Sequence, residues 1–209
     1  GSVIVKDFSK EKFKMNLKSN KVNVIKILPG GVVTAKDTAE IELDANGEFV
    51  RNLEVDLVKV AVVERHQGTG NVACGFLKGY GIKEGAVALS IAHDSHNIIV
   101  VGVSDEEMEF AVNSLIEQEG GMVLVKEGKV IESMPMPIAG LMSDQSGEWV
   151  DQKLTDIHEK AYEELGICGD VEPVMTLCFM SLAVIPEIKL TDMGLFDVTT
   201  FSFIPVEAE

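Results

Sequence analysis

Two polar loops carry three of the four histidines in this sequence of 209 residues. The first loop spans residues 64–71 (ERHQGTGN) and the second spans residues 93–97 (HDSHN). Each loop follows an apolar segment typical of a β-strand, and a loop held by a rigid sheet is a common place for a functional site. We therefore expect the two loops to meet on one exposed rim of the molecule.

The residue types in these loops suit acid–base chemistry. His93 is a candidate general base, Asp94 is the carboxylate that would orient it, and Arg65 has a guanidinium fork suited to an anionic or planar polar group. The competing interpretation is structural, because His, Asp, Ser and Asn side chains in tight turns often bond to the local backbone. His158 lies beside an apolar helical stripe and is expected to be structural.

No known metal-ligand spacing occurs in the sequence. A metal site needs three or four converging ligands; His93 and His96 lie in one expected turn, and His66 or Cys74 would have to fold towards them. Residues 68–73 (GTGNVA) fit the G-x-G-x-x-A dinucleotide fingerprint, but four polar residues separate them from the preceding strand. A helix after them would contain glycines, each costing about 1 kcal/mol relative to alanine. We interpret them as a glycine-rich loop and predict no metal or cofactor on this chain.

The composition argues against two classes of partner. There are 18 Lys and Arg against 34 Asp and Glu, and the net charge of −16 disfavours nucleic acid and anionic membrane surfaces. The longest apolar stretch, residues 174–185, is interrupted by polar residues and is shorter than the roughly 20 residues of a membrane-spanning helix. Three cysteines without a Cys-x-x-Cys pair are typical of a reduced, cytoplasmic protein.

The first part of the chain predicts a small β-layer. Residues 1–21 form a polar N-terminal arm, whose Gly1-Ser2 start is typical of a tag remnant, and residues 22–209 form the main domain. An Asn-Gly pair predicts a hairpin turn at residues 44–47. The strands are expected to form an antiparallel layer, which could be a small β-subdomain at residues 22–63. β-branched runs place these strands at residues 22–28, 32–35, 39–43 and 55–63.

The rest of the chain predicts two helices between strands. Ser104 and Glu107 form a capping box at the start of one helix, and Ser146 caps a second helix over residues 148–165. The tail, residues 173–205, is expected to hold one buried stretch and an edge strand. Strands are expected at residues 86–91, 97–103, 122–125 and 129–133. The predicted fold class is therefore α+β, with a largely antiparallel or mixed β-sheet flanked by two main helices.

Four segments, in order along the chain, resemble the C-terminal region of bacterial and archaeal adenine deaminases. They are residues 62–81 (VVERH, GTGN, GF and GYG), 92–102 (AHDSHNIIVVG), 137–143 (PIAGLMS) and 185–195 (IPEIKLTD and GL). The resemblance implies an enzyme of the amidohydrolase superfamily that hydrolyses adenine to hypoxanthine and ammonia in purine salvage. It also implies divalent manganese or iron in a barrel domain, which in the family precedes this region and carries His-x-His ligands. This sequence has no His-x-His, and it is too short to hold a barrel of about 250 residues beside the four segments.

The resemblance therefore implies an accessory domain that supports the active site of a barrel outside this sequence. Its partner would be its own N-terminal amidohydrolase barrel or a barrel-bearing subunit, and the domain alone is not expected to turn over adenine. The candidate catalytic residues, in a supporting role, are His93, Asp94 and His96. The residues expected to bind substrate or to close the site are Arg65, His66, Thr69, Asn71, Ser95 and Asn97. Gln67 departs from the family, in which many members carry a second histidine.

Two alternatives come from other classes of function. The strands and the apolar tail could form the interface of a homo-oligomer, with the histidine loops serving only as well-bonded turns. The domain could also bind a purine without hydrolysing it.

Overall fold

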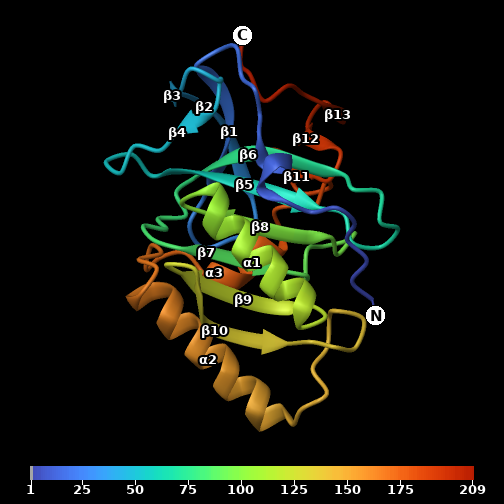
Figure 1. The fold of residues 1–209 in the computed structure, drawn as a ribbon. Coiled ribbons are helices and arrows are strands. Elements are labelled where there is room, and N and C mark those ends of the chain that lie inside the picture. Colours follow the sequence, from blue (N-terminus) through green and yellow to red (C-terminus); the bar gives the residue numbers. More distant parts are fainter. Residues whose placement is uncertain (1) are drawn as a thin grey trace.

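An eight-stranded sheet forms the centre of the molecule, as the computed structural model of residues 2–209 shows (Figure 1). Its strands are β1 (Lys21–Ile27), β2 (Thr34–Glu40), β5 (Leu57–Val63), β6 (Val72–Lys78), β7 (Ala86–Leu89), β8 (Ile98–Gly102), β9 (Gly121–Lys126) and β10 (Lys129–Pro135). Their order across the sheet is β10-β9-β7-β8-β5-β6-β1-β2. β1 pairs in parallel with β6, and the other neighbours in this sheet pair antiparallel. This mixed, largely antiparallel sheet confirms the predicted α+β class.

Both faces of the sheet are covered, because its central strands are apolar on both sides. Every residue of β5 is buried. One face packs against the helix α1 (Asp105–Glu117) and the N-terminal arm, which contains the 3-10 turn η1 (Lys10–Phe13). The other face packs against α2 (Gly147–Glu163), the short helix α3 (Pro173–Cys178) and a smaller sheet. Figure 1 shows α1 in front of the sheet and α2 beside β10.

The two main helices begin where the sequence predicts. The Ser104 hydroxyl accepts a hydrogen bond from the Glu107 N–H (3.2 Å), and the Ser146 hydroxyl accepts one from the Trp149 N–H (3.3 Å). The other half of the predicted capping box differs, because the Glu107 carboxylate accepts a hydrogen bond from the N–H of Gly128 (3.1 Å). That contact ties the start of α1 to the hairpin between β9 and β10.

The early strands differ from the prediction in one respect. Residues 34–40 form the single strand β2, where the sequence predicted two strands at 32–35 and 39–43. β2 is an edge strand whose side chains alternate between more and less buried positions. Lys36 and Glu40 are exposed, but Asp37 lies on the more buried side, where it accepts a hydrogen bond from Lys78 (3.0 Å). Because that side carries a charge, the sequence lacks the clean apolar–polar alternation that marks a strand. β1, β2 and β5 all belong to the central sheet. The predicted turn at 44–47 joins β3 (Glu42–Leu43) to β4 (Phe49–Val50).

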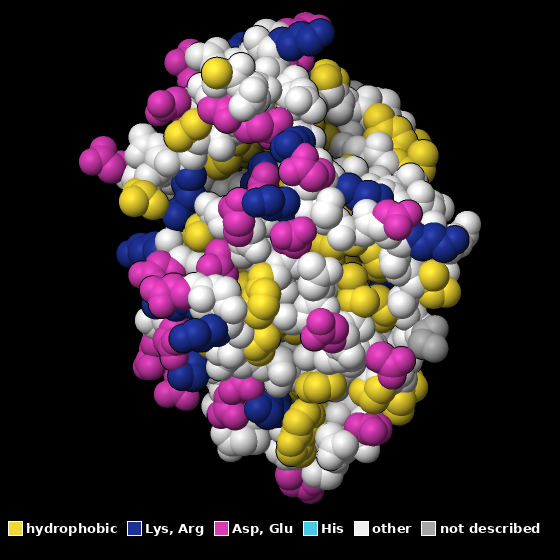
Figure 2. Space-filling view, viewed as in Figure 1, with side chains coloured by type: hydrophobic (Ala, Val, Ile, Leu, Met, Phe, Trp, Pro, Cys, Tyr) yellow, Lys and Arg dark blue, Asp and Glu magenta, His cyan; other side chains and the backbone are white. Residues whose placement is uncertain are grey.

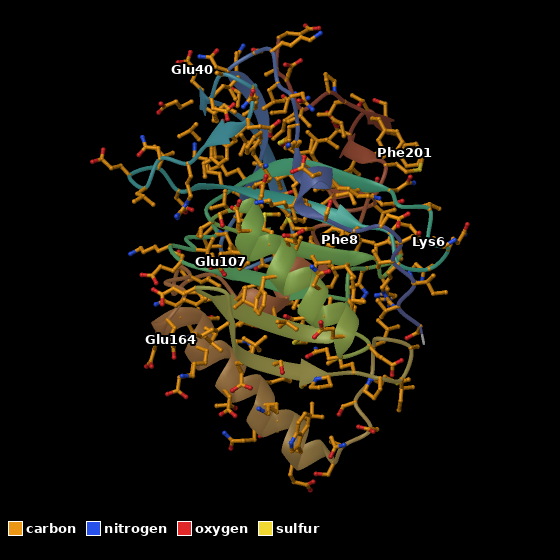
Figure 3. All side chains as sticks on the ribbon, in the orientation of Figure 1. Lys6, Phe8, Glu40, Glu107, Glu164 and Phe201 are labelled. Atoms are coloured by element: carbon orange, nitrogen blue, oxygen red, sulfur yellow. The ribbon has the colours of Figure 1, made fainter. Side chains whose placement is uncertain are left out.

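The C-terminal tail contains more structure than predicted. The strands β11 (Ile188–Thr191), β12 (Gly194–Asp197) and β13 (Ser202–Phe203) form a three-stranded sheet, and α3 precedes them. The residues of α3 are nearly all buried, so its sequence has no polar face to reveal a helical period. In the turn after β12, Phe201 packs edge-on against Phe196 at 5.3 Å and is 75 % exposed (Figure 3).

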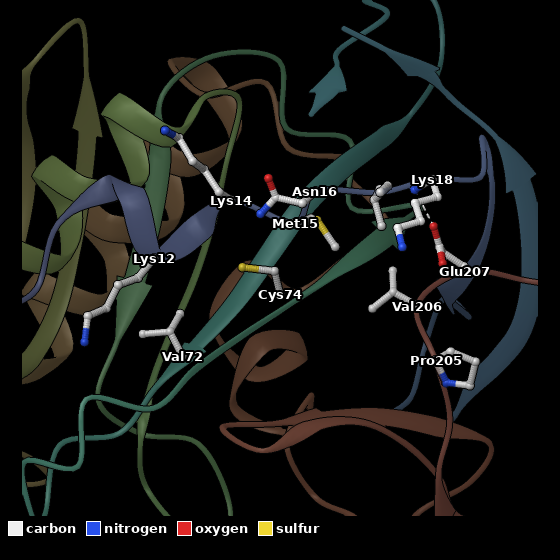
Figure 4. A pocket seen from close by; sticks show the side chains of 11 residues that line it. Lys12, Lys14, Met15, Asn16, Lys18, Val72, Cys74, Pro205, Val206 and Glu207 are labelled. Atoms are coloured by element: carbon white, nitrogen blue, oxygen red, sulfur yellow. Dashed lines mark hydrogen bonds between the residues drawn. The ribbon is translucent and has the colours of Figure 1, made fainter. Parts of the chain in front are cut away.

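The N-terminal arm is attached to the sheet by a buried lysine. Lys59 on β5 donates hydrogen bonds to the carbonyl of Phe13 (3.0 Å) and to the carboxylate of Asp105 (2.8 Å). Phe13 itself is fully buried. Beyond this anchor, a hollow of about 340 Å³ lies between the arm, β6 and the C-terminal tail, with Cys74 and Lys12 in its lining (Figure 4). The arm is therefore held at β5, whereas the C-terminal tail bonds to β1 through Asn23 and Lys21.

Charged side chains of both signs are interspersed over the face in Figure 2, which carries α1 and the arm. Within residues 2–209, no helix combines the length and the apolar character that crossing a lipid bilayer would need.

Two glycines test how tightly the strand ends pack. Gly85 and Gly128 share a φ of +68°, but their surroundings differ. A Cβ added to Gly85 would lie 1.9 Å from the carbonyl oxygen of Val125, whereas a Cβ added to Gly128 would lie in open space. We expect Gly128→Ala to lower the free energy of unfolding by about 1–2 kcal/mol, the cost of left-handed backbone. Gly85→Ala should cost about 1–3 kcal/mol more, because the backbone must move. Urea unfolding measures both values, and equal losses would contradict the crowding at Gly85.

Candidate functional site

The two histidine loops meet because the strands that bear them are neighbours. β5 ends at Val63 and β8 begins at Ile98, and these two residues are paired across the antiparallel ladder. The loop that follows β5 and the loop that precedes β8 therefore emerge at the same edge of the sheet. His66 Nε2 lies 2.6 Å from the carbonyl oxygen of Ser95, which joins the loops directly. The predicted meeting of the loops is confirmed.

Arg65 lies buried beneath this junction, with 1 % of its surface exposed. Its Nε donates to the carbonyl of His96 (2.5 Å), and its Nη1 donates to that of Ser2 (2.8 Å). Its Nη2 donates to the carbonyls of Ala139 (3.1 Å) and Ser90 (3.4 Å). No carboxylate in residues 2–209 forms an ion pair with it. The guanidinium thus binds four main-chain carbonyls rather than open solvent, and burial lowers the pKa of Arg65.

The turn at residues 138–142 reaches Arg65 through a glycine. Gly140 has a φ of +71°, and an added Cβ would lie 2.8 Å from Arg65 Nη1. The carbonyl of Gly140 also accepts a hydrogen bond from the buried hydroxyl of Ser90 (2.5 Å). The third of the four segments that resemble adenine deaminases is therefore packed against the first.

Glu64 shapes the first loop from inside. Its carboxylate accepts hydrogen bonds from the N–H groups of His66 (2.5 Å), Gln67 (2.8 Å) and Thr69 (2.9 Å), and from the Thr69 hydroxyl (3.0 Å). Burial alone would raise the pKa of Glu64, but these four donors outweigh it and lower the pKa to about 2. A carboxylate with its donors fixed in this way serves to hold the loop.

Asp192 joins both loops to the smaller sheet. It lies in the turn between β11 and β12, where one carboxylate oxygen accepts from the Asn97 amide (3.2 Å) and the other from the Asn71 amide (3.5 Å). The Asn97 side-chain oxygen in turn accepts from the N–H of Arg65 (3.3 Å). The fourth segment thereby contacts the first and the second, so all four converge on one site.

The second loop presents an aromatic cluster. The ring of His93 lies 4.8 Å from that of Phe179 and 5.1 Å from that of His96, measured between ring centroids. The Nδ1 atom of His96 is buried and has no hydrogen-bond partner within residues 2–209. Burial, together with the nearby His93 and Arg65, lowers the pKa of His96 and favours its neutral form. A ligand could reach this nitrogen only if the ring or its neighbours moved, because the atom is buried.

The remaining predicted residues are divided between the tip and the base of the loops. Asp94 and Ser95 are exposed at the tip of the second loop, and His66, Thr69 and Asn71 are exposed on the first. Asn97, in contrast, is 4 % exposed. His158 lies elsewhere, on α2, where its ring bonds to the Leu154 carbonyl and the Glu172 carboxylate, as expected for a structural histidine.

Three contributors were absent from the sequence prediction: Glu64, Phe179 and Asp192. Glu64 is the first residue of the loop, and a carboxylate before a glycine-rich turn is a signal that could have found it. Asp192 and Phe179 lie about a hundred residues from the loops and are brought there only by the tertiary fold. Among residues 2–209, no group of three or more His, Cys, Asp and Glu side chains is placed to hold a metal ion.

The fold and the site define an α+β domain that holds a histidine-bearing rim without assembling metal ligands among residues 2–209. The family model for the adenine deaminase C-terminal domain matches residues 31–202. This chain therefore belongs to the adenine deaminase C-terminal domain family.

Curated relatives match along the whole chain. Adenine deaminase 2 of Desulfotalea psychrophila is 66 % identical over 208 residues, which cover 100 % of this chain and 36 % of the relative. The adenine deaminase of Ligilactobacillus salivarius is 49 % identical over 208 residues, again 100 % of this chain and 36 % of the relative. That of Bacillus subtilis is 44 % identical over 200 residues, 95 % of this chain and 34 % of the relative. The chain thus spans about a third of the length of these relatives.

The low pKa of Glu64 predicts that the stability of the fold depends on pH. Its folded pKa of about 2 lies below its ordinary value of 4.5, so its stabilisation is complete above pH 4.5 and is lost as the pH falls towards 2. We expect Glu64→Gln to lower the free energy of unfolding by about 2–3 kcal/mol at pH 7. The difference in free energy of unfolding between Glu64→Gln and the wild type should be smaller at pH 3.

Urea unfolding at pH 7 and pH 3 measures this gap. Glu163→Gln, which changes an exposed carboxylate on α2, is the matched control and should shift stability by less than about 0.5 kcal/mol. If Glu64→Gln lowered the free energy of unfolding by as much at pH 3 as at pH 7, the charge of the carboxylate would not be what holds the loop.

Proposed function

We propose that this domain supports the active site of an adenine deaminase, with its histidine rim placed at the mouth of an amidohydrolase barrel. The barrel would be its own N-terminal part or a separate subunit, and together they would hydrolyse adenine to hypoxanthine and ammonia in cytoplasmic purine salvage. The observation that carries the proposal is that all four segments that resemble the family converge on one rim. The domain alone would not turn over adenine.

The rim residues would have two roles. Arg65, Glu64 and Asn97 are buried, and they bond to main-chain and side-chain groups of the loops, so they act as positioning residues. His93, Asp94 and His96 would support the reaction from the second loop. The residues that would contact the purine edge or close the site are His66, Thr69, Asn71 and Ser95.

The described residues do not fit the metal that the resemblance implies. No cluster of ligating side chains occurs in residues 2–209, and the unpartnered nitrogen of His96 is a single candidate ligand where three or four are needed. The divalent manganese or iron would therefore belong to the barrel, and no step of the hydrolysis is assigned to a metal on this chain.

A chimera provides the direct test of the proposed support. This chain would replace the matching third of the Desulfotalea psychrophila relative, to which it is 66 % identical. We expect His93→Ala, Asp94→Ala and His96→Ala each to lower kcat/KM for adenine by about tenfold to a hundredfold, since misplaced supporting groups cost that much. Steady-state deamination assays measure the change.

The control variant is Asp151→Ala, which removes an exposed carboxylate on α2. It should leave kcat/KM unchanged, and Asp94 is itself exposed, so Asp94→Ala should fold normally. If all three rim variants matched the control in turnover and in stability, the loops would be architectural and the proposed support would be wrong.

A purine-binding role without catalysis is favoured by one observation, the aromatic cluster of His93, His96 and Phe179. Offset or edge-on contacts between such rings and a purine are favourable. Calorimetric titration of the isolated chain with adenine and with hypoxanthine tests this role. Binding that is lost in Phe179→Ala would support it, and no heat at millimolar ligand would exclude it.

A further inference from the structure

The N-terminal arm contacts the first histidine loop at both of its glycines. Lys12 Nζ donates a hydrogen bond to the carbonyl of Gly70 (2.8 Å). The stem of Lys6 lies across Gly68, where an added Cβ would be 3.2 Å from three of the lysine methylene carbons. Gly68 and Gly70 have φ values of +63° and +76°, in the left-handed region that favours glycine. The arm therefore covers the loop where its backbone has the greatest conformational freedom.

Lys12 holds the part of the loop that Glu64 does not reach. The Glu64 carboxylate accepts hydrogen bonds from N–H groups only as far along the loop as that of Thr69. The carbonyl of Gly70 comes next, and within residues 2–209 Lys12 is its one hydrogen-bond donor. Gly70 lies between Thr69 and Asn71, two of the residues that would contact the purine edge. The position of this end of the loop thus depends on the arm.

The backbone from which Lys12 extends is itself fixed. Lys12 belongs to η1, which ends at the fully buried Phe13. The carbonyl of Phe13 accepts from the buried Lys59 (3.0 Å), and the N–H of Lys10 donates to the Glu109 carboxylate on α1 (2.8 Å). A side chain can fix a loop only when its own backbone is held, and here β5 and α1 both hold it.

We propose that Lys12 is a positioning residue, which sets where Thr69 and Asn71 meet the purine. This inference rests on the proposed function, because it gives a role to one loop of the histidine rim at the barrel mouth. Lys12 holds the loop backbone, and contact with the substrate is left to the side chains of the loop. Such contacts are made in the substrate complex as well as in the transition state, so their loss is expected in KM rather than in kcat.

Hydrogen–deuterium exchange of this chain tests the contact without an activity assay. Lys12→Met keeps most of the stem and removes the donor, so the amides of residues 66–71 should exchange about threefold to tenfold faster. Exchange in α2 should not change, which shows that the fold is intact. Lys12→Arg retains a long cationic donor and should restore slow exchange. Lys14→Met is the matched control, because Lys14 is exposed and pairs with Glu11 rather than with the loop.

Steady-state kinetics of the chimera described above give a second readout. Lys12→Met should raise KM for adenine about threefold to tenfold, the range for one lost hydrogen bond, and should change kcat by less than about twofold. Lys12→Arg should recover most of this loss. Lys14→Met should leave both constants at their wild-type values.

The outcomes separate this inference from the proposed function. If the loop of Lys12→Met exchanges as slowly as that of the wild type, Lys12 does not hold the loop and the inference is overturned. If exchange is faster and KM is unchanged while the histidine variants lose turnover, the positioning role is wrong and the support by the second loop stands. If the histidine variants keep full turnover, that support is wrong, and a KM raised by Lys12→Met still assigns the first loop to the substrate.

Discussion

The buried guanidinium of Arg65 is the interaction on which the site depends. An ionised group inside a protein is costly unless polar partners replace its water, and here the partners are four carbonyl dipoles rather than a carboxylate. These carbonyls come from the arm, the end of β7, the second loop and the turn at 138–142. Because one rigid planar group must satisfy all of them, it fixes their relative positions more closely than a flexible ammonium would. A shift of any one segment leaves a buried N–H without its acceptor.

Two carboxylates hold the rest of the site in the same way, by hydrogen bonds to other groups of the protein. Glu64 holds the first loop through donors of that same loop, and Asp192 joins two amides from different loops. The charged side chains that hold the rim are thus bonded to the protein itself. The histidines and Asp94 are left at the surface, where they lie partly or fully exposed. The holding groups and the groups available to a ligand are therefore different residues, as expected of a preorganised site.

Local sequence signals predicted the elements that make local contacts. Ser104 and Ser146 begin helices because each hydroxyl caps a nearby N–H, and that chemistry depends on three adjoining residues. The hairpin at 44–47 and the strands around the second loop were predicted for similar reasons. β2 was mispredicted, and α3 was predicted only as a buried stretch and not as a helix, because the surroundings determine their patterns. β2 is a solvated edge, and α3 is buried nearly all round. The residue types in these two elements follow their exposure to solvent rather than the repeat of a strand or a helix, and exposure depends on the whole fold.

For the site, the sequence predicted the loops but not how they are held. The residue types at 64–71 and 93–97 were sufficient to identify the loops as a candidate site. The contact with Asp192 could not be predicted in this way, because it requires β11, nearly a hundred residues further along the chain, to lie against the central sheet. Arg65 shows the difference most clearly. Its fork suits an anionic ligand, but its position two residues after a fully buried strand places it inside the molecule, where carbonyls of the protein occupy that fork. Burial is therefore what separates the residues that hold such a site from those that can face a substrate, and it depends on how the strands pair.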